Sequence, residues 1–470
     1  MVLENTTFDE LQPGTSFEHR RICTIDDLYV FAAVSGNHNP MHVPDNDEDN
    51  RPVASGIWCS SLISAVLGNY LPGPGTLYHS QSMNFVGRVH AGDEVVTRVT
   101  VKEKHDDGTV TLKTEVCLAN GGASILQGEA VVIAPTEKIR FDDENLPGLV
   151  VQRHRHFKAL IRKAEPLAPL ITAVICPEEP QSLGGALAAA ERSIITPLLV
   201  GNRERILATA AELGEDISPF ELIHVDGEDA AANAGVDLVT AGRAKALMKG
   251  HLHTDHLLRA ALRKTGGLRR GRRFTHTFVV DVPGVMHPLL VTDAAINIAP
   301  DLKAKVDIVQ NAIDLAISIG IETPKVGVLS AVELVNPAIA SSIDAALLSK
   351  MAERGQIKGG LVEGPLAMDN AVDPGAAGTK GIKSMVAGYA QVLVVPDLDA
   401  GNMLVKQLTF MAGAEAAGVV LGASVPIILT SRADDVMSRL ASCAVAAIHQ
   451  ARMSGEIPTP AAADEAIAEA

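Results

Sequence analysis

The sequence predicts an α+β domain at the N-terminus, followed by a larger α/β domain. Residues 94–102 and 109–116 alternate between apolar and polar side chains, which indicates antiparallel strands with one solvated face. After Phe157, short runs with the composition of buried strands alternate with helical segments. This second pattern is typical of a largely parallel sheet.

Composition limits the classes of function. The chain has 470 residues, which is too long for one ordinary core and suggests two to four domains. A formal net charge of −16 argues against a nucleic acid or a membrane surface as partner. The five cysteines are scattered without a CxxC motif, so neither a disulfide framework nor a zinc site is indicated. With no signal region and no long apolar segment, we expect a cytoplasmic protein.

Residues 53–70 have the pattern of one apolar helix ahead of the alternating strands. A single buried helix wrapped by an antiparallel sheet is the hot-dog arrangement. The segments SGNHNPMH at residues 35–42, LPGPG at 71–75 and FVGRVHAGD at 85–93 resemble the MaoC-like, (R)-specific enoyl-CoA hydratases of that fold. We therefore expect a hot-dog domain at residues 1–137.

The resemblance implies an Asp and a His five residues apart, which activate water for addition to an enoyl-CoA double bond. His42 matches the histidine, but Asn37 stands at the Asp position. An amide can orient a water molecule but cannot accept its proton. Arg88 also stands where the family usually has proline. Three roles stay open for this domain: an active hydratase, an oligomerisation module and a sensor of CoA.

Residues 138–156 contain charges of both signs, a Pro-Gly pair and little periodicity, so we expect an exposed linker. The α/β domain then spans residues 157–470. Neither GxGxxG after a strand nor GxxxxGK[ST] occurs, which argues against dinucleotide and P-loop sites. Expected strands and helices follow in order: strands at 171–176, 196–200, 220–225, 245–249, 278–282, 288–293, 325–329, 360–363, 392–395 and 425–429, and helices at 182–193, 302–319, 338–354 and from 399.

Polar residues follow the last two of these strands. The run 392–395 ends in Pro-Asp, after which Asp399-Ala-Gly-Asn402 opens a helix whose first backbone N–H groups favour anions. The run 425–429 leads into Thr430-Ser431-Arg432 and then Asp434-Asp435. Ligands of open α/β sheets bind at the ends of strands, so both segments are candidate sites.

These segments, with MKG at 248–250, TDHLLR at 254–259 and EGPLAMDNA at 363–371, resemble the phosphate acetyl- and butyryltransferase family over about residues 157–470. The resemblance implies a two-lobed, three-layer α/β domain with the active site between the lobes. Lobe I would comprise about residues 157–275 and 425–470, and lobe II about 276–424. It also implies reversible acyl transfer between acyl-CoA and inorganic phosphate, giving acyl phosphate and CoA.

By the same resemblance, Asp435 is the base for the CoA thiol, with Asp434 as its rival. Arg432 stabilises the developing oxyanion or phosphate, Ser431 donates a hydrogen bond to the same centre, and Arg259 holds the phosphate. CoA is a substrate, no bound cofactor is required, and we expect a homo-oligomer, a dimer or higher. The expected substrate-binding residues are Asp399, Gly401, Asn402, Lys249, Gly250 and Thr254.

One alternative is a zinc-dependent hydrolase. His251, His253, Asp255 and His256 match the HxHxDH pattern of metallo-β-lactamase-type enzymes. The flanking sequence follows the transferase pattern, so we expect no metal there. The basic run at residues 268–273 is either a solvated turn or a contact for the CoA phosphates. The preferred length of the acyl chain stays open between acetyl and butyryl.

Overall fold

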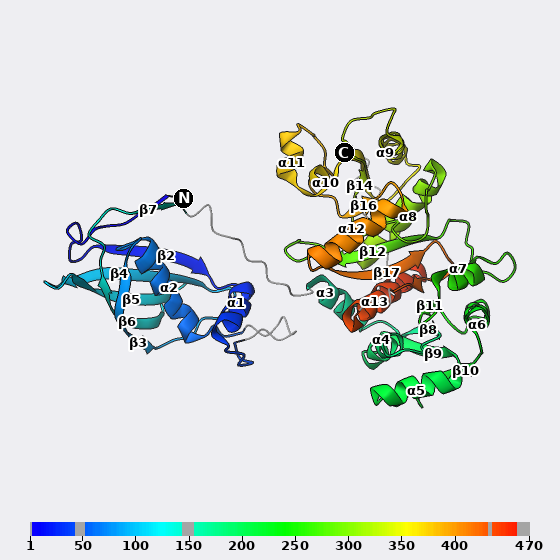
Figure 1. Ribbon diagram of the computed structural model, residues 1–470, viewed down its shortest axis with the longest axis horizontal. Helices are drawn as coiled ribbons and strands as arrows, with labels where there is room; N and C mark the ends of the chain where they lie inside the picture. Colours follow the sequence, from blue (N-terminus) through cyan, green and yellow to red (C-terminus); the bar gives the residue numbers. More distant parts are fainter. Residues whose placement is uncertain (1, 43–51, 143–154, 431–434, 458–470) are drawn as a thin grey trace. The chain divides into compact units, whose positions relative to one another are not determined.

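The computed structural model describes residues 2–42, 52–142, 155–430 and 435–457 (Figure 1). The chain divides into two compact units, Met1–Val151 and Gln152–Ala470. None of the helices in the described ranges has the length and apolar character needed to cross a membrane.

The first unit contains a five-stranded antiparallel sheet that packs on one central helix, α2. The strands lie in the order β2 (Ser16–Ile22), β4 (Glu94–Lys104), β5 (Thr109–Leu118), β6 (Ser124–Ile133) and β3 (Leu77–Phe85). The helices are α1 (Ile25–Ser35) and α2 (Gly56–Asn69). This is the expected arrangement of one helix held by an antiparallel sheet.

The alternating pattern explains which face of this sheet is buried. On β4, every second residue from Val95 to Val101 is buried, including Thr97, whereas the residues between them are more exposed. The buried residues of α2 recur every three to four positions, which places them on the face that meets the sheet. They are Trp58, Cys59, Leu62, Ile63, Val66 and Leu67.

The segment expected as a linker, residues 138–156, is partly structured. Residues Arg140–Asp142 form β7, which pairs antiparallel with β1 (Val2–Glu4). Helix α3 (Arg155–Ala164) begins before the expected end of the linker. A three-residue strand offers too little periodicity to be recognised in a charged segment.

The second unit is built on one eleven-stranded sheet with helices on both faces. Its strands are β8 (Leu170–Ile175), β9 (Ile195–Gly201), β10 (Glu221–His224), β11 (Ala246–Lys249), β12 (Thr275–Asp281), β13 (Leu289–Thr292), β14 (Lys325–Leu329), β15 (Leu361–Leu366), β16 (Val392–Val394), β17 (Glu415–Leu421) and β18 (Ile427–Ile428). Its further helices are α4 (Pro180–Glu191), α5 (Arg203–Leu213), α6 (Glu228–Thr240), α7 (Thr254–Leu262), α8 (Leu302–Ile319), α9 (Ala340–Glu353), α10 (Met368–Val372), α11 (Pro374–Thr379), α12 (Leu398–Met411) and α13 (Val436–Met453).

The strands form two parallel groups that run in opposite directions. β10, β9, β8, β11 and β18 are parallel to one another, as are β13, β16, β14 and β15. β17 and β12 lie between the groups and form only antiparallel pairs. The carboxyl ends of the strands in one group therefore lie at the opposite end of the sheet from those in the other group.

Strand β17, which pairs antiparallel with both of its neighbours, is not among the strands expected from the sequence. Its residues follow α12 closely and are mostly Ala, Gly and Val, so they were included in the helical segment that begins at 399. The helix ends before Gly413, whose φ of 65° is in the left-handed region that favours glycine.

Helices cover both faces of this sheet. Val279 and Leu290 pack in one cluster with α3, α4, α8 and α13, whereas Val280 and Val291 pack in another with α12. Helices α6 and α7 pack on Val420 of β17. Because side chains alternate along a strand, Val420 lies on the same face of the sheet as α12. The unit therefore has three layers.

Candidate functional site

The described residues on either side of 431–434 form hydrogen bonds with α13. Ser431, Arg432 and Asp434 lie outside the described residues. Before them, Thr430 Oγ1 accepts a hydrogen bond of 2.8 Å from Arg439 Nη1, and both side chains are buried. After them, Asp435 caps α13 by accepting the N–H of Ser438 at 2.8 Å.

Asp435, the expected base, lies in a group of carboxylates. Burial, together with the charges of Asp435 and Asp281, raises the pKa of Glu415 to about 7. Asp281 accepts the backbone N–H groups of the first residues of α3, at 2.9 and 3.0 Å. Glu415, the first residue of β17, is not among the site residues predicted from the sequence. A glutamate at a strand start, next to a capping aspartate in space, carries no sequence signal.

The expected substrate-binding residues after β11 occupy a tight turn. Lys249 is buried, and its Nζ lies 3.4 Å from the carbonyl oxygen of Gly250. A Cβ atom on Gly250 would lie 2.4 Å from the carbonyl oxygens of Ile175 and Cys176, so no larger residue fits. Thr254 is the first residue of α7.

Arg259 lies on the exposed surface of α7. Its guanidinium is 3.1 Å from Asp255 and 3.5 Å from Asp229, and 65% of the side chain is exposed. Exposed ion pairs of this kind contribute little to stability. A phosphate could therefore replace these carboxylates as the partner of Arg259.

The PDLDAGN segment begins α12. Asp397 is the capping residue and accepts the N–H of Ala400 at 2.9 Å, while Asp399 is exposed in the first turn. Gly401 is buried, and a Cβ atom there would lie 2.9 Å from Ala294. Its absent side chain therefore permits close packing. Asn402, the next residue, is partly buried.

The loop after β13 packs against two apolar clusters, one with α12 and one with α6 and α7. Asp293 is buried and accepts the N–H groups of Ala295 and Ile296, each at 3.0 Å. Ala295 and Ile296 pack against the cluster under α6 and α7, whereas the preceding Ala294 packs with α12. This loop therefore contacts the apolar clusters on both sides.

A buried histidine lies beneath this loop. His276 on β12 is fully buried, and burial lowers its pKa to about 4, with the charge of Asp293 opposing the shift. Its ring packs edge-on against Phe278 at 4.4 Å between centroids. His276 is therefore neutral near pH 7.

The histidines of the HxHxDH segment bond to separate carboxylates. His251 Nδ1 lies 2.7 Å from Glu179 Oε2, and His256 Nδ1 lies 2.5 Å from Asp229 Oδ1. Within the described ranges, no group of three or more His, Cys, Asp or Glu side chains is arranged to hold a metal ion.

In the first unit, the two expected hydratase residues follow α1. His42 Nδ1 lies 2.7 Å from the carbonyl oxygen of Val53. A carbonyl only accepts, so Nδ1 carries the proton and Nε2 keeps its lone pair. Asn37 Oδ1 accepts the N–H of Asn39 at 3.2 Å. The imidazole is thus oriented as a proton acceptor, whereas Asn37 supports the loop.

Two family models match the chain. The model described as Phosphate acetyl/butaryl transferase matches residues 228–447, and the MaoC like domain model matches residues 9–119. The two matches fall on separate compact units.

Individual relatives cover most of the second unit. The phosphate acetyltransferase of Rhizobium meliloti is 57% identical over 296 residues, or 63% of this chain and 94% of that protein. The phosphate butyryltransferase of Clostridium acetobutylicum is 38% identical over 294 residues, or 63% of this chain and 98% of that protein. A branched-chain phosphotransacylase structure from Enterococcus faecalis is 30% identical, has a TM-score of 0.53, and covers 60% of this chain and 99% of its own. The predicted fold class, a MaoC-like hot-dog domain followed by a phosphate acyltransferase domain, is confirmed.

Proposed function

The chain belongs to the phosphate acetyl/butyryltransferase family, and we propose that its second unit catalyses the reversible reaction of acyl-CoA with phosphate to acyl phosphate and CoA. The observation that carries this proposal is the match across nearly the whole length of phosphate acetyl- and butyryltransferases. CoA is a substrate in this reaction, and the proposal includes no bound cofactor.

The reaction poses an electrostatic problem. In the direction of acyl-CoA formation, the CoA thiol, with a pKa near ~8.5, must lose its proton before sulfur attacks the acyl carbonyl carbon. The carbon–oxygen bond to phosphate then breaks, and phosphate leaves with the bonding electrons. Because every reactant is an anion, the site must supply a base and fixed cations that hold the reactants together.

The proposed base is Asp435, with Asp434 as the alternative. Asp435 Oδ1 already accepts the N–H of Ser438, which fixes the carboxylate at the start of α13. This position directly follows the segment that carries Ser431 and Arg432, for which we propose contacts to the oxyanion and phosphate.

The proposed phosphate-binding residues come from α7 and the turn before it. The exposed guanidinium of Arg259 can exchange its carboxylate partners for two phosphate oxygens, which suits its planar fork. Lys249, Gly250 and Thr254 provide an ammonium group, a close backbone approach and a hydroxyl at the carboxyl end of β11. For Asp399, Gly401 and Asn402 we propose that the start of α12 contacts CoA.

The direct test measures thiol release from acyl-CoA in the presence of phosphate, using the full-length protein and acyl chains of two to six carbons. We expect phosphate-dependent release, and the chain length with the highest kcat/KM decides between acetyl and butyryl specificity. A folded protein that releases no thiol from any of these substrates would overturn the proposal.

Hydration of an enoyl-CoA by the first unit is a second candidate function. The observation that favours it is the His42–Val53 contact, which leaves Nε2 able to accept a proton. Asn37 argues against this function, because an amide cannot act as a base together with the histidine. The alternative role as an oligomerisation or CoA-sensing module needs no base.

We also propose a homo-oligomer located in the cytoplasm. Leu77, Tyr78 and Phe85 on the edge strand β3 are exposed, and a second copy could cover them. All five cysteines are free thiols, which suits a reducing compartment. Size measurement in solution tests the oligomer.

A further inference from the structure

A cavity of about 470 Å³ lies between α8, the end of α13, the loop before β12 and the loop after β17. Cavities of this size accommodate small organic ligands. Its charged lining residues are Arg270, Arg272, Arg452 and Asp314. Three guanidinium groups against one carboxylate give the cavity a local charge of about +2, although the whole chain is acidic.

The three arginines differ in their ion pairs and hydrogen bonds. Arg272 lies 2.5 Å from Asp314, so this pair neutralises itself. Arg452 has one terminal nitrogen, Nη2, that is buried and has no hydrogen-bond partner in the described part of the chain. Arg270 is exposed at the rim and forms no ion pair within the described ranges. Two guanidinium groups therefore lack a counter-charge, and an anionic ligand would give Nη2 of Arg452 the hydrogen-bond partner that it lacks.

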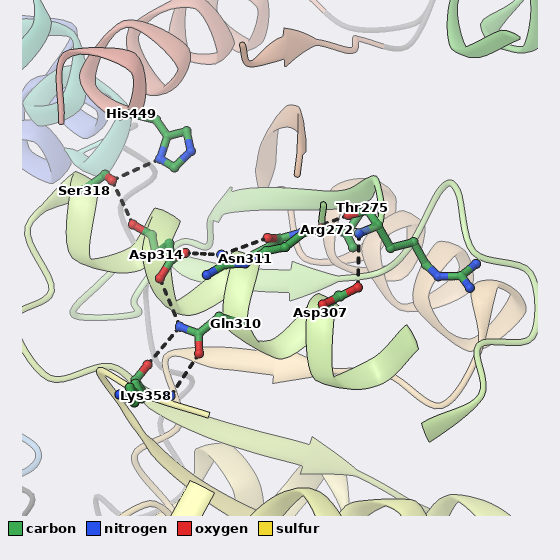
Figure 2. A network of polar contacts seen from close by, with 10 residues as sticks. Arg272, Thr275, Asp307, Gln310, Asn311, Asp314, Ser318, Lys358 and His449 are labelled. Atoms are coloured by element: carbon green, nitrogen blue, oxygen red, sulfur yellow. Dashed lines mark hydrogen bonds and ion pairs between the residues drawn. The ribbon is translucent and has the colours of Figure 1, made fainter. Parts of the chain in front are cut away.

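The wall around the arginines is held in place by a hydrogen-bond network (Figure 2). Asn311 accepts from Arg272 at 3.4 Å and donates to Thr275 at 3.0 Å. Gln310 donates to Asp314 at 3.0 Å. The cationic wall is therefore ordered before any ligand arrives, which lowers the entropic cost of binding.

Figure 2 also shows the contact between Ser318 on α8 and His449 on α13. Ser318 donates its hydroxyl hydrogen to the carbonyl oxygen of Asp314 at 2.8 Å, so it must accept the contact of 3.0 Å from His449 Nδ1. His449 Nε2 then keeps a lone pair. Burial lowers the pKa of His449 to about 4, so the ring is neutral and can accept a hydroxyl hydrogen near pH 7.

An apolar side completes the cavity, formed by Ile317, Leu421 and Met453. We propose that this cavity binds a small phosphate monoester with a hydroxyl-bearing body, such as a nucleoside monophosphate. Its dianionic phosphate matches the two uncompensated guanidinium groups, a hydroxyl reaches His449, and the ring lies on the apolar side.

The cavity is separate from the proposed transferase site. Helix α13 is 18 residues long, or about 27 Å at 1.5 Å per residue. Asp435 caps its start, whereas Arg452 and Met453 lie at its end. The cavity also lies on the α8 and α13 face of the sheet, opposite the face that α7 and α12 cover.

The test is a calorimetric titration of AMP into the full-length protein, with saturating CoA present so that the transferase site is filled. We expect one saturable site. Each of Arg270→Gln and Arg452→Gln should raise Kd by roughly tenfold to a hundredfold, because a charge-assisted hydrogen bond is lost. Met453→Glu at the partly exposed rim should also weaken binding, because it places a carboxylate on the apolar side and adds a negative charge to a cavity that would hold a dianion.

Arg354→Gln is the matched control, since this exposed arginine at the end of α9 does not line the cavity. It should leave Kd unchanged, and transferase turnover of every variant checks that it is folded. No binding of AMP to the CoA-saturated protein, or equal Kd values for the wild type and both arginine variants, would overturn the proposal. Inorganic phosphate that binds as tightly as AMP would overturn the part that concerns the organic body.

Discussion

Arg439 on α13 and Thr430 at the end of β18 are joined by a hydrogen bond of 2.8 Å between two buried side chains. Arg439 is among the largest fully buried side chains of the chain, and a Cβ atom on Gly185 of α4 would lie 2.7 Å from its Cδ. The guanidinium thus ties the strand that leads into Ser431 to the helix that follows it.

The first prediction concerns this contact. Thr430→Val should lower the free energy of unfolding by about 1–3 kcal/mol, because a buried guanidinium N–H loses its acceptor at nearly constant side-chain volume. Turnover should fall as well, since the contact borders Ser431. Thr240→Val, on the exposed end of α6, is the control for urea unfolding. Unchanged stability of the Thr430 variant would show that the contact is not significant.

The second prediction follows from the raised pKa of Glu415. Its pKa is about 7 in the folded state and ordinarily 4.5. Between these two pH values the folded state therefore binds more protons than the unfolded state. Stability from this group is present below pH 4.5 and is lost as the pH rises through about 7. Glu415→Gln should therefore gain stability relative to wild type as the pH rises through this window, measured as the difference in Tm. A difference that is flat with pH, like that of the exposed control Glu204→Gln, would contradict the shift.

The third prediction concerns the two arginines proposed to hold phosphate. Arg259→Ala and Arg432→Ala should each lower kcat/KM by about a hundredfold to a thousandfold, as does loss of one preorganised oxyanion contact. Arg432→Lys should also be poor, because an ammonium group cannot form a paired contact. Arg243→Ala removes a similar exposed ion pair, with Glu221, and should have little effect on turnover. Normal kinetics of either test variant would remove that residue from the site.

The fourth prediction tests the first unit. The wild type should hydrate crotonyl-CoA weakly or not at all, and Asn37→Asp should increase the rate by about 10²–10⁴-fold by supplying the carboxylate that the hydratase resemblance pairs with His42. Asn39→Asp adds the same charge two residues away and should give no gain. Strong wild-type hydration that His42→Ala abolishes would mean that another group serves as base. No gain from Asn37→Asp would favour the structural or sensing role.

The fifth prediction separates packing from substrate binding at Gly401. Gly401→Ala should destabilise the protein by about 1–3 kcal/mol, because the new methyl group meets Val395 and Ala294 at less than 3 Å. Gly184→Ala on α4 meets only one side-chain atom, at 3.9 Å, and should stabilise by about 0.5–1 kcal/mol. A change in KM for CoA without a change in stability would instead assign Gly401 to the substrate site.

Most of the fold could be predicted because periodicity reports burial. The strands at 94–102 and 109–116 show a period of two, and α8 ends as expected at Ile319, where Gly320 takes a left-handed φ of 113°. β17 could not be predicted, because Ala and Gly suit a helix as well as a buried strand. Its antiparallel placement follows from pairing with β12, which lies more than a hundred residues earlier in the chain.

The candidate sites could be predicted only where their residues are contiguous. The motif at 431–435 is visible in the sequence, whereas Glu415 joins Asp435 only through the fold. The basic run at 268–273 was interpreted as a solvated turn or a CoA contact. Arg270 and Arg272 line a cavity with Arg452, which is far away in the sequence and reaches them because α13 runs back across the sheet.

The antiparallel centre of the large sheet limits how the proposed lobes can move. β17 and β12 are paired along their full length, from Thr275 with Leu421 to Asp281 with Glu415, so the two parallel groups share one ladder of hydrogen bonds. The two groups cannot rotate apart about a hinge without breaking these hydrogen bonds, unless the whole sheet twists. Opening and closing around CoA should therefore involve small changes in sheet twist and movements of the surrounding segments, with no separation of rigid domains.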